Sequence, residues 1–146
     1  MLKCNFFLDS SALIAGVLSS TGAARALLVL SENESLNLYI NEHVLIECER
    51  SLARKVPEAL PEFRNTIKNA RLKILENPAP EEVHSHLYLI ADPQDVAILL
   101  SALACKTDFL ITHNRKHFLD DPQVAEKTGL RIGTPGDALA WLREQR

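Results

Sequence analysis

Residues 92–112 read DPQDVAILLSALACKTDFLIT, and this stretch predicts a helix followed directly by a buried strand. Asp92 can cap the helix, and Pro93 is tolerated in its first turn because the N–H that it lacks has no helical partner there. Residues 96–104 are apolar almost all round, which indicates a helix covered by neighbours. Residues 108–112 form a short apolar run between polar residues, which is typical of a buried parallel strand.

Further strands and helices alternate along the rest of the chain. Short apolar runs predict strands at Asn5–Leu8, Leu36–Ile40, Leu72–Leu75 and Leu130–Ile132. Helical patterns cover residues 12–18, 23–31 and 62–70, the segment that Asn41 caps, and the segment after the capping box Thr134–Asp137. This alternation with short connections predicts an α/β sandwich around a small, mostly parallel sheet.

Two segments stay open at this point. Residues 81–91 are compatible with a short helix, a strand or an irregular lead-in to the central helix. Residues 113–118, HNRKHF, form a polar loop or a single helical turn after the strand at 108–112.

The composition is that of an ordinary globular protein, with 47% hydrophobic and 24% charged residues in a chain of 146. That length fits one domain spanning residues 1–146. Cys4, Cys48 and Cys105 are too scattered for a disulfide framework or a CxxC metal motif, so we expect reduced thiols. Because neither a leader pattern nor an apolar run of about 18 residues is present, we expect a cytoplasmic protein without membrane association.

The net charge of −3 argues weakly against a nucleic-acid partner, but the charges are unevenly distributed. Between Arg50 and Lys73 the cationic residues clearly outnumber Glu58 and Glu62. The simpler interpretation of this region is a solvated face, and RNA contact is the alternative.

Several carboxylates are expected to meet at the carboxyl edge of the sheet, where ligands bind in such folds. Asp9 follows the first strand, and Asp95 begins the central helix. On the helix between them, Glu47 and Glu49 flank the apolar stripe on opposite sides, and periodicity does not decide which one faces the site. Clustered acids repel unless a cation neutralises them, and such oxygen ligands suit Mg²⁺ or Mn²⁺, which support phosphodiester hydrolysis.

The ordered motifs resemble those of PIN domains, in particular the VapC-like toxins and orphan bacterial PIN proteins. The matching segments are FFLDSSALIAG at Phe6–Gly16, INEHVLIECERSL at Ile40–Leu52, DPQDVAILLSALACKTDFLITHNRKHF at Asp92–Phe118 and RIGTPGDAL at Arg131–Leu139. The resemblance implies a three-layer α/β/α fold and a metal-dependent endoribonuclease that hydrolyses single-stranded RNA. If the protein is a toxin, it further implies a small antitoxin partner and a homodimer.

Carried over by position, the resemblance makes Asp9, Glu47 and Asp95 the ligands of Mg²⁺ or Mn²⁺, with Ser11 as a supporting hydroxyl. The family pattern selects Glu47 over Glu49. The chain departs at the fourth catalytic position, where many members have Asp in a Thr-x-Asp pattern and this chain has Asn114. An asparagine can ligate through its carbonyl or order a water, but it adds no charge.

The same residues also have purely structural interpretations. Asp9 can simply cap the helix that follows, Glu47 can be a solvated helix residue, and Asp95 is favoured in a first turn by the helix dipole alone. Asp92 is expected to be a cap rather than a ligand, and Asp108 a turn residue far from the site.

Two further residues are expected to have structural roles. His43 is expected at the surface, and Trp141 in the core or a dimer contact.

The residues also allow two other functions. One is a catalytically weakened PIN-like domain that binds RNA or protein. The other is an Asp-phosphorylated receiver or phosphatase, which lacks its second acid because Ser11 stands at that position.

Overall fold

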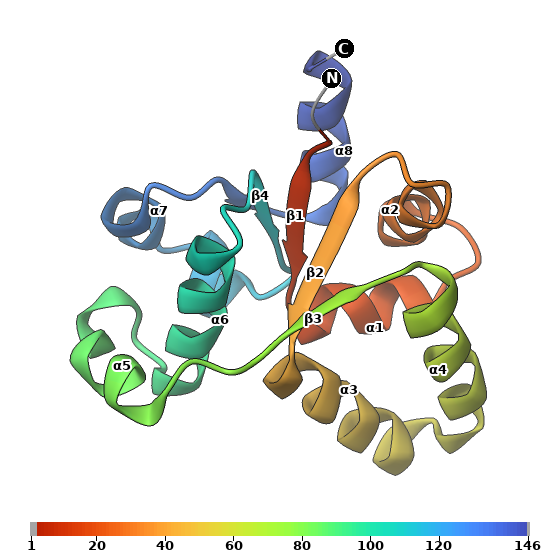
Figure 1. The fold of residues 1–146 in the computed structure, drawn as a ribbon, viewed down its shortest axis with the longest axis horizontal. Helices are drawn as coiled ribbons and strands as arrows, with labels where there is room; N and C mark the ends of the chain where they lie inside the picture. The colour runs from red at the N-terminus through yellow and green to blue at the C-terminus, as the bar shows by residue number, and fades with distance from the viewer. Residues whose placement is uncertain (1–2, 146) are drawn as a thin grey trace.

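The computed structural model describes residues 3–145, which form one five-stranded sheet flanked by helices (Figure 1). All strand pairings are parallel, and the strand order is β3-β2-β1-β4-β5. The strands are β1 (Asn5–Leu8), β2 (Asn37–Asn41), β3 (Lys73–Leu75), β4 (Phe109–Ile111) and β5 (Ile132–Gly133). The predicted α/β/α fold with a small parallel sheet is confirmed.

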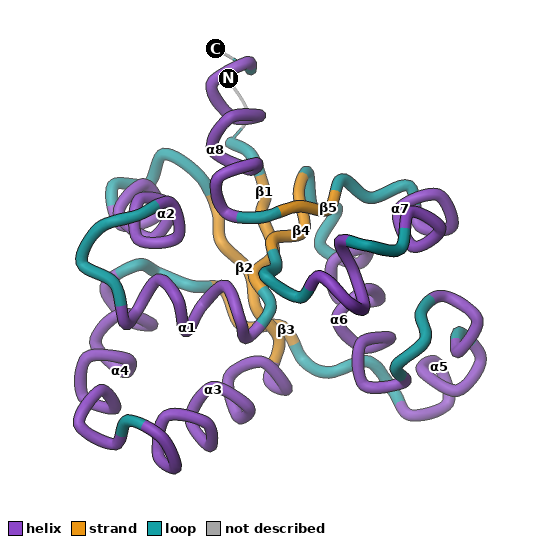
Figure 2. Tube along the Cα trace, turned by 180° about the vertical axis from the view of Figure 1, so that it is seen from behind, coloured by secondary structure: helices purple, strands orange, loops and turns teal. Residues whose placement is uncertain are grey.

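Helices lie on both sides of the sheet, with α1 to α4 on one side and α5 to α7 on the other (Figures 1 and 2). The α-helices are α1 (Ser10–Leu18), α2 (Ala23–Glu32), α3 (Glu42–Lys55), α4 (Leu60–Asn69), α5 (Pro80–Ser85), α6 (Pro93–Ala104), α7 (Pro122–Thr128) and α8 (Pro135–Glu144). Short 3-10 helices lie at Pro57–Ala59 and Leu87–Leu89, and a single π-helical turn lies at Arg115–Leu119.

The central unit of the sequence forms the middle of the fold, as its pattern predicts. Asp92 caps α6 by accepting a hydrogen bond from the backbone N–H of Gln94 at 3.0 Å. Residues 98–102 of α6 are all buried, and all of β4 is buried. Leu103 is 39% exposed, so the helix keeps one solvent-facing strip near its end.

Aromatic packing closes the core beside β1 and β4. The ring of Trp141, on α8, lies 5.9 Å from that of Phe6 and 6.1 Å from that of Phe109. Trp141 therefore packs inside its own chain. On α1, Gly16 permits close contact with α2, since a Cβ there would lie 2.7 Å from Leu28 Cδ1.

The segments left open by the sequence are now assigned. Residues 81–91 contain all of α5 except Pro80, together with the 3-10 helix at Leu87–Leu89, and the polar loop after β4 ends in the π-helical turn. The last strand starts at Ile132, two residues later than the apolar run that predicts it. Cys4, Cys48 and Cys105 are free thiols, as expected.

Membrane-spanning potential was assessed for the described helices. None of them alone is long and apolar enough to span a bilayer. The pair α1 and α2 meets the length and composition criteria together, with a bend of 88° between the two helices.

Candidate active site

Asp9 lies at the carboxyl edge of the sheet, where β1 and β4 run side by side. Leu8 pairs with Ile111, and Asp9 follows Leu8 with a side chain that is almost completely buried. Its Oδ1 accepts hydrogen bonds from the N–H of Ala12 at 3.0 Å and the hydroxyl of Ser11 at 2.7 Å. Asp9 thus caps α1, as one structural interpretation holds, and it also faces the site described below.

The second carboxylate oxygen of Asp9 accepts a hydrogen bond from the hydroxyl of Thr112, at the end of β4. Burial raises the pKa of Asp9, and the hydrogen bonds from Ser11, Thr112 and Ala12 oppose that rise. Proximity to Glu47 raises the pKa of Asp9 further. Three hydrogen-bond donors therefore hold the carboxylate in position, and none of these donors carries a positive charge.

The same two hydroxyls hold the loop that follows β4. Ser11 Oγ accepts a hydrogen bond from the N–H of His113 at 3.0 Å, and Thr112 Oγ1 accepts one from the N–H of Asn114 at 2.9 Å. Ser11 therefore supports Asp9 directly, and it also links α1 to the loop.

Glu47 approaches from α3, whose start is fixed by the buried side chain of Asn41. Asn41 accepts a hydrogen bond from the N–H of Val44 at 2.9 Å and donates one to Ser101 Oγ of α6 at 3.0 Å. One oxygen of Glu47 accepts a hydrogen bond from the hydroxyl of Ser10, and the other lies 3.3 Å from His43 Nε2.

Glu49 points elsewhere, since its carboxylate lies 3.8 Å from the guanidinium of Arg64 on α4. The structure thus separates the two acids that periodicity leaves undecided. Glu47 lines the cavity at the sheet edge, and Glu49 pairs on a different side of α3.

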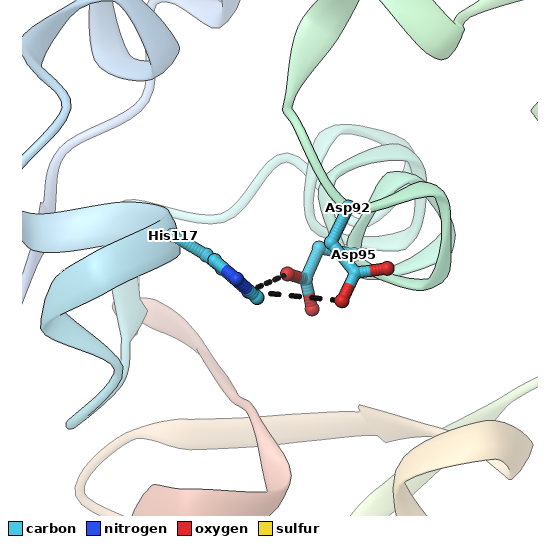
Figure 3. Close-up of side chains that lie close together, drawn as sticks. All are labelled: Asp92, Asp95 and His117. Carbon is cyan, nitrogen blue, oxygen red and sulfur yellow. Dashed lines mark hydrogen bonds and ion pairs between the residues drawn. The ribbon is translucent and has the colours of Figure 1, made fainter.

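Asp95, in the first turn of α6, points toward His117 (Figure 3). Its Oδ2 lies 3.0 Å from His117 Nδ1, and Asp92 Oδ2 lies 3.7 Å from the same nitrogen. Burial and then the charge of Asp92 raise the pKa of Asp95 to about 6, although His117 lowers it in part. Asp92 is confirmed as a cap, and it is also a neighbour of the candidate ligand.

Asn114 has a positioning role that its sequence context does not reveal. Its Oδ1 accepts a hydrogen bond from the N–H of His117 at 3.1 Å, so it caps the π-helical turn. Its Nδ2 lies 3.4 Å from His117 Nδ1. Asn114 therefore holds the histidine that contacts Asp95.

All four predicted residues line one cavity of about 380 Å³. Its lining consists of Asp9, Ser10, Ser11, His43, Glu47, Asp95, Ile98, His113 and Asn114. No lysine or arginine lines this cavity in the described part of the chain. The carboxylates thus face one another across a space without a permanent cation.

The oxygen donors of this cavity fit a hard divalent cation. Mg²⁺ retains several waters and needs only one or two direct carboxylates, and Mn²⁺ accepts the same oxygen donors. Asp9 and Asp95 both have raised pKa values, so a cation would favour their charged forms.

The tightest grouping of ligand atoms differs from the predicted one. Within residues 3–145, Asp92, Asp95 and His117 bring one ligand atom each within 4.8 Å of the others. Glu47 instead accepts a hydrogen bond from Ser10 and lies close to His43. Asp95 belongs to both groups, so it is the ligand candidate that the geometry supports most.

The contacts of the acids with Ser10, His43 and His117 were not predicted from the sequence. His43 is partly exposed, as expected of a surface residue, and it also contacts Glu47 and lines the cavity. The signal was available, since residues four apart on a helix are neighbours. The 22-residue separation of Asp95 and His117 carries no such signal.

Comparison with known proteins gives a consistent result. A family model described as the PIN domain matches residues 5–116. Among proteins with curated descriptions, none matches the chain by sequence.

Solved structures share the fold at low sequence identity. PAE2754 from Pyrobaculum aerophilum is 19% identical with a TM-score of 0.66, and the alignment covers 97% of this chain and 96% of that one. VapBC2 from Rickettsia felis, bound to a promoter DNA fragment, is 19% identical with a TM-score of 0.62 and coverages of 88% and 96%. VapC20 from Mycobacterium tuberculosis, a toxin that cleaves the sarcin-ricin loop, is 14% identical with a TM-score of 0.52 and coverages of 76% and 91%.

Proposed function

Because the chain belongs to the PIN-domain family, we propose that it is a metal-dependent endoribonuclease that hydrolyses single-stranded RNA. The observation that carries this proposal is the convergence of Asp9, Glu47 and Asp95 on one cavity. Asp9 follows β1, Glu47 lies on α3 and Asp95 lies on α6, which are far apart in the sequence, and the cavity lies where parallel sheets bind ligands.

The acids and their neighbours have distinct roles in this proposal. Asp9, Glu47 and Asp95 hold Mg²⁺ or Mn²⁺, which supplies charge stabilisation and an activated water for phosphodiester hydrolysis. Ser11 and Thr112 orient Asp9, His43 orients Glu47, and His117 orients Asp95. Asn114 acts through His117, which it caps.

We further propose that the protein is the toxin of a toxin–antitoxin pair, restrained by a small antitoxin and active as a homodimer. The similarity to the toxin VapC20 and to the VapBC2 complex supports this role. Growth arrest on induction of the wild-type chain, absent with Asp95→Asn, is the expected result. Equal arrest with both chains would contradict the toxin role.

The test of catalysis is cleavage of end-labelled single-stranded RNA in Mg²⁺ or Mn²⁺, with and without EDTA. We expect EDTA to abolish cleavage, and Asp9→Asn, Glu47→Gln or Asp95→Asn to lower the rate by about 100-fold or more. Glu49→Gln is the matched control, because it removes the same charge from the same helix on the side that contacts Arg64. Metal-independent cleavage, or equal losses for Glu47→Gln and Glu49→Gln, would contradict the proposal.

A binding protein without catalysis is the second candidate, and the capping role of Asn114 favours it. The amide oxygen that replaces the fourth acid already accepts a backbone hydrogen bond. Calorimetric titration with Mn²⁺ separates the two functions. No heat of binding with the wild-type protein would support the second, and binding that Asp95→Asn abolishes would support the nuclease.

A further inference from the structure

A second hollow of about 550 Å³ opens directly beside the acid cavity. The two share Ser10, Ser11, His43 and Glu47 in their linings. The second hollow is lined mainly by residues of α1 and α3, and Gln94 at the start of α6 also lines it. Together they form a groove with the candidate active site at one end.

The far part of this groove is basic. Arg50 and Arg54 line it, and they follow Glu47 by three and seven residues, on the same face of α3. Both side chains are exposed. Within residues 3–145, neither forms an ion pair or a side-chain hydrogen bond, which leaves both guanidinium groups available to a ligand.

Other arginines of the basic region differ in this respect. Arg64 lies 3.8 Å from Glu49, and Arg71 lies 3.4 Å from Glu34. The region that the sequence analysis interprets as one solvated face therefore contains two kinds of arginine. One kind has a carboxylate partner, and the other has no such partner within residues 3–145 and lines the groove beside the acids.

Two apolar residues also line the groove. They are Ile14 and Ile46, and Ile46 is 47% exposed although it is large and hydrophobic. Cations beside an exposed apolar side chain match the two parts of a nucleotide, its charged phosphate and the flat face of its base. Arg50 and Arg54 are one turn apart, with a rise of about 6 Å along the helix, so each can meet a different phosphate of one strand.

We propose that this groove binds the single-stranded RNA next to the bond that is cut. Arg50 and Arg54 contact successive backbone phosphates, and a base packs on Ile46. This proposal rests on the proposed function in two respects. The proposed function identifies the bound molecule as single-stranded RNA, and it implies that the RNA runs from the arginines to the acids, where it is cut. Because it uses phosphates and an apolar contact, it gives the enzyme affinity without sequence selection.

The test compares Arg50→Gln/Arg54→Gln with the control Arg64→Gln/Arg71→Gln, since both double variants lose two positive charges. Binding of a fluorescein-labelled single-stranded RNA is followed by anisotropy in EDTA, which prevents metal-dependent cleavage. We expect the groove variant to bind about tenfold more weakly near 0.1 M salt, with a salt slope smaller by about 1.4. The control should stay within about twofold of wild type.

Ile46→Ser provides a second, independent readout. It should weaken RNA binding by about three- to tenfold and leave the salt slope unchanged, because it removes apolar contact and no charge. Thermal unfolding of each variant confirms that the fold is retained, which is expected because all of the substituted side chains are exposed.

Equal losses in the two double variants would overturn the proposal, because a general charge effect would then explain them. Absence of RNA binding by the wild-type chain would also overturn it and would leave the groove to a protein partner. Failure of the proposed catalysis is distinguishable from these two outcomes. A protein that never cleaves RNA can still bind it, and its affinity for RNA would then fall in the groove variants and not in the control. A nuclease that uses another path would cleave equally with and without Arg50 and Arg54.

Discussion

The pairing of Asp95 with His117 gives the amide of Asn114 a structural role beside the acids. Asp95 already has a raised pKa, with Asp92 and Asp9 as charged neighbours. A further carboxylate in place of Asn114 would add repulsion in a cavity that no described lysine or arginine lines. The amide instead caps the turn that presents His117 to Asp95.

This arrangement gives the metal-free protein a defined dependence of stability on pH. The pKa of Asp95 is about 6 in the folded chain against an ordinary value of 3.8, so the folded state binds the proton more tightly. The favourable contribution is complete below about pH 4 and is lost as the pH rises through 6. Above that pH the ionised carboxylate destabilises the fold.

Asp95→Asn should therefore stabilise the metal-free protein at pH 7.5, by about 1–2 kcal/mol, and have little effect at pH 4. Urea unfolding in EDTA across this range measures the difference. Glu58→Gln, which changes an exposed carboxylate, should give a difference that does not vary with pH in this way. A gain for Asp95→Asn that is equally large at pH 4 would show that Asp95 ionisation is not its cause.

At the scale of elements, the start of α6 combines a cap with a site. Asp92 accepts a hydrogen bond from Gln94 N–H through one oxygen, and its other oxygen lies 3.7 Å from His117. The cap requires only an oxygen acceptor, which asparagine also provides, whereas a metal ligand of this kind requires the charge.

Two substitutions of Asp92 separate these roles. Asp92→Asn should change the free energy of unfolding by less than about 0.5 kcal/mol, and Asp92→Ala should lower it by about 1 kcal/mol through loss of the cap. Both variants should retain most of the RNA cleavage. Cleavage lost in Asp92→Asn together with unchanged stability would make Asp92 a ligand and overturn its assignment as a cap.

The sequence predicts α6 and β4 well because their apolar patterns, caps and turns are local features. It predicts β5 less well, since Ile132–Gly133 owes its position to pairing with Leu110 and Ile111, which a local pattern does not contain. Likewise, residues 81–91 lack a clear period, and only the packed structure separates α5 from the 3-10 helix after it.

Across the whole molecule, the topology brings together acids that the sequence separates. The placement of Asp9 and Asp95 follows from strand ends and helix starts, so it was predictable. The choice of Glu47 over Glu49 needed either the family pattern or the structure, because periodicity places neither at the site. The hydrogen bonds of the acids with Ser10 and His117 depend on side-chain rotamers and long-range packing, which no local pattern encodes.

The two groups of candidate ligands make different predictions about how metal stabilises the whole fold. A cation held by Asp9, Glu47 and Asp95 links the end of β1 to α3 and α6, and these two helices lie on different sides of the sheet. A cation held by Asp92, Asp95 and His117 links only the start of α6 to the turn after β4. Asp95 is common to both, so its variant cannot separate them.

Glu47→Gln and His117→Gln separate the two sites in a thermal unfolding experiment with Mn²⁺. A ligand at 100 times its dissociation constant stabilises the folded state by about 2.7 kcal/mol, which raises the melting temperature by roughly 8 °C for a chain of this size. We expect Glu47→Gln to abolish most of this rise, while His117→Gln and Glu49→Gln keep most of it, because His117 orients Asp95 without belonging to the site. The reverse pattern, with the rise lost in His117→Gln and kept in Glu47→Gln, would move the metal to Asp92, Asp95 and His117.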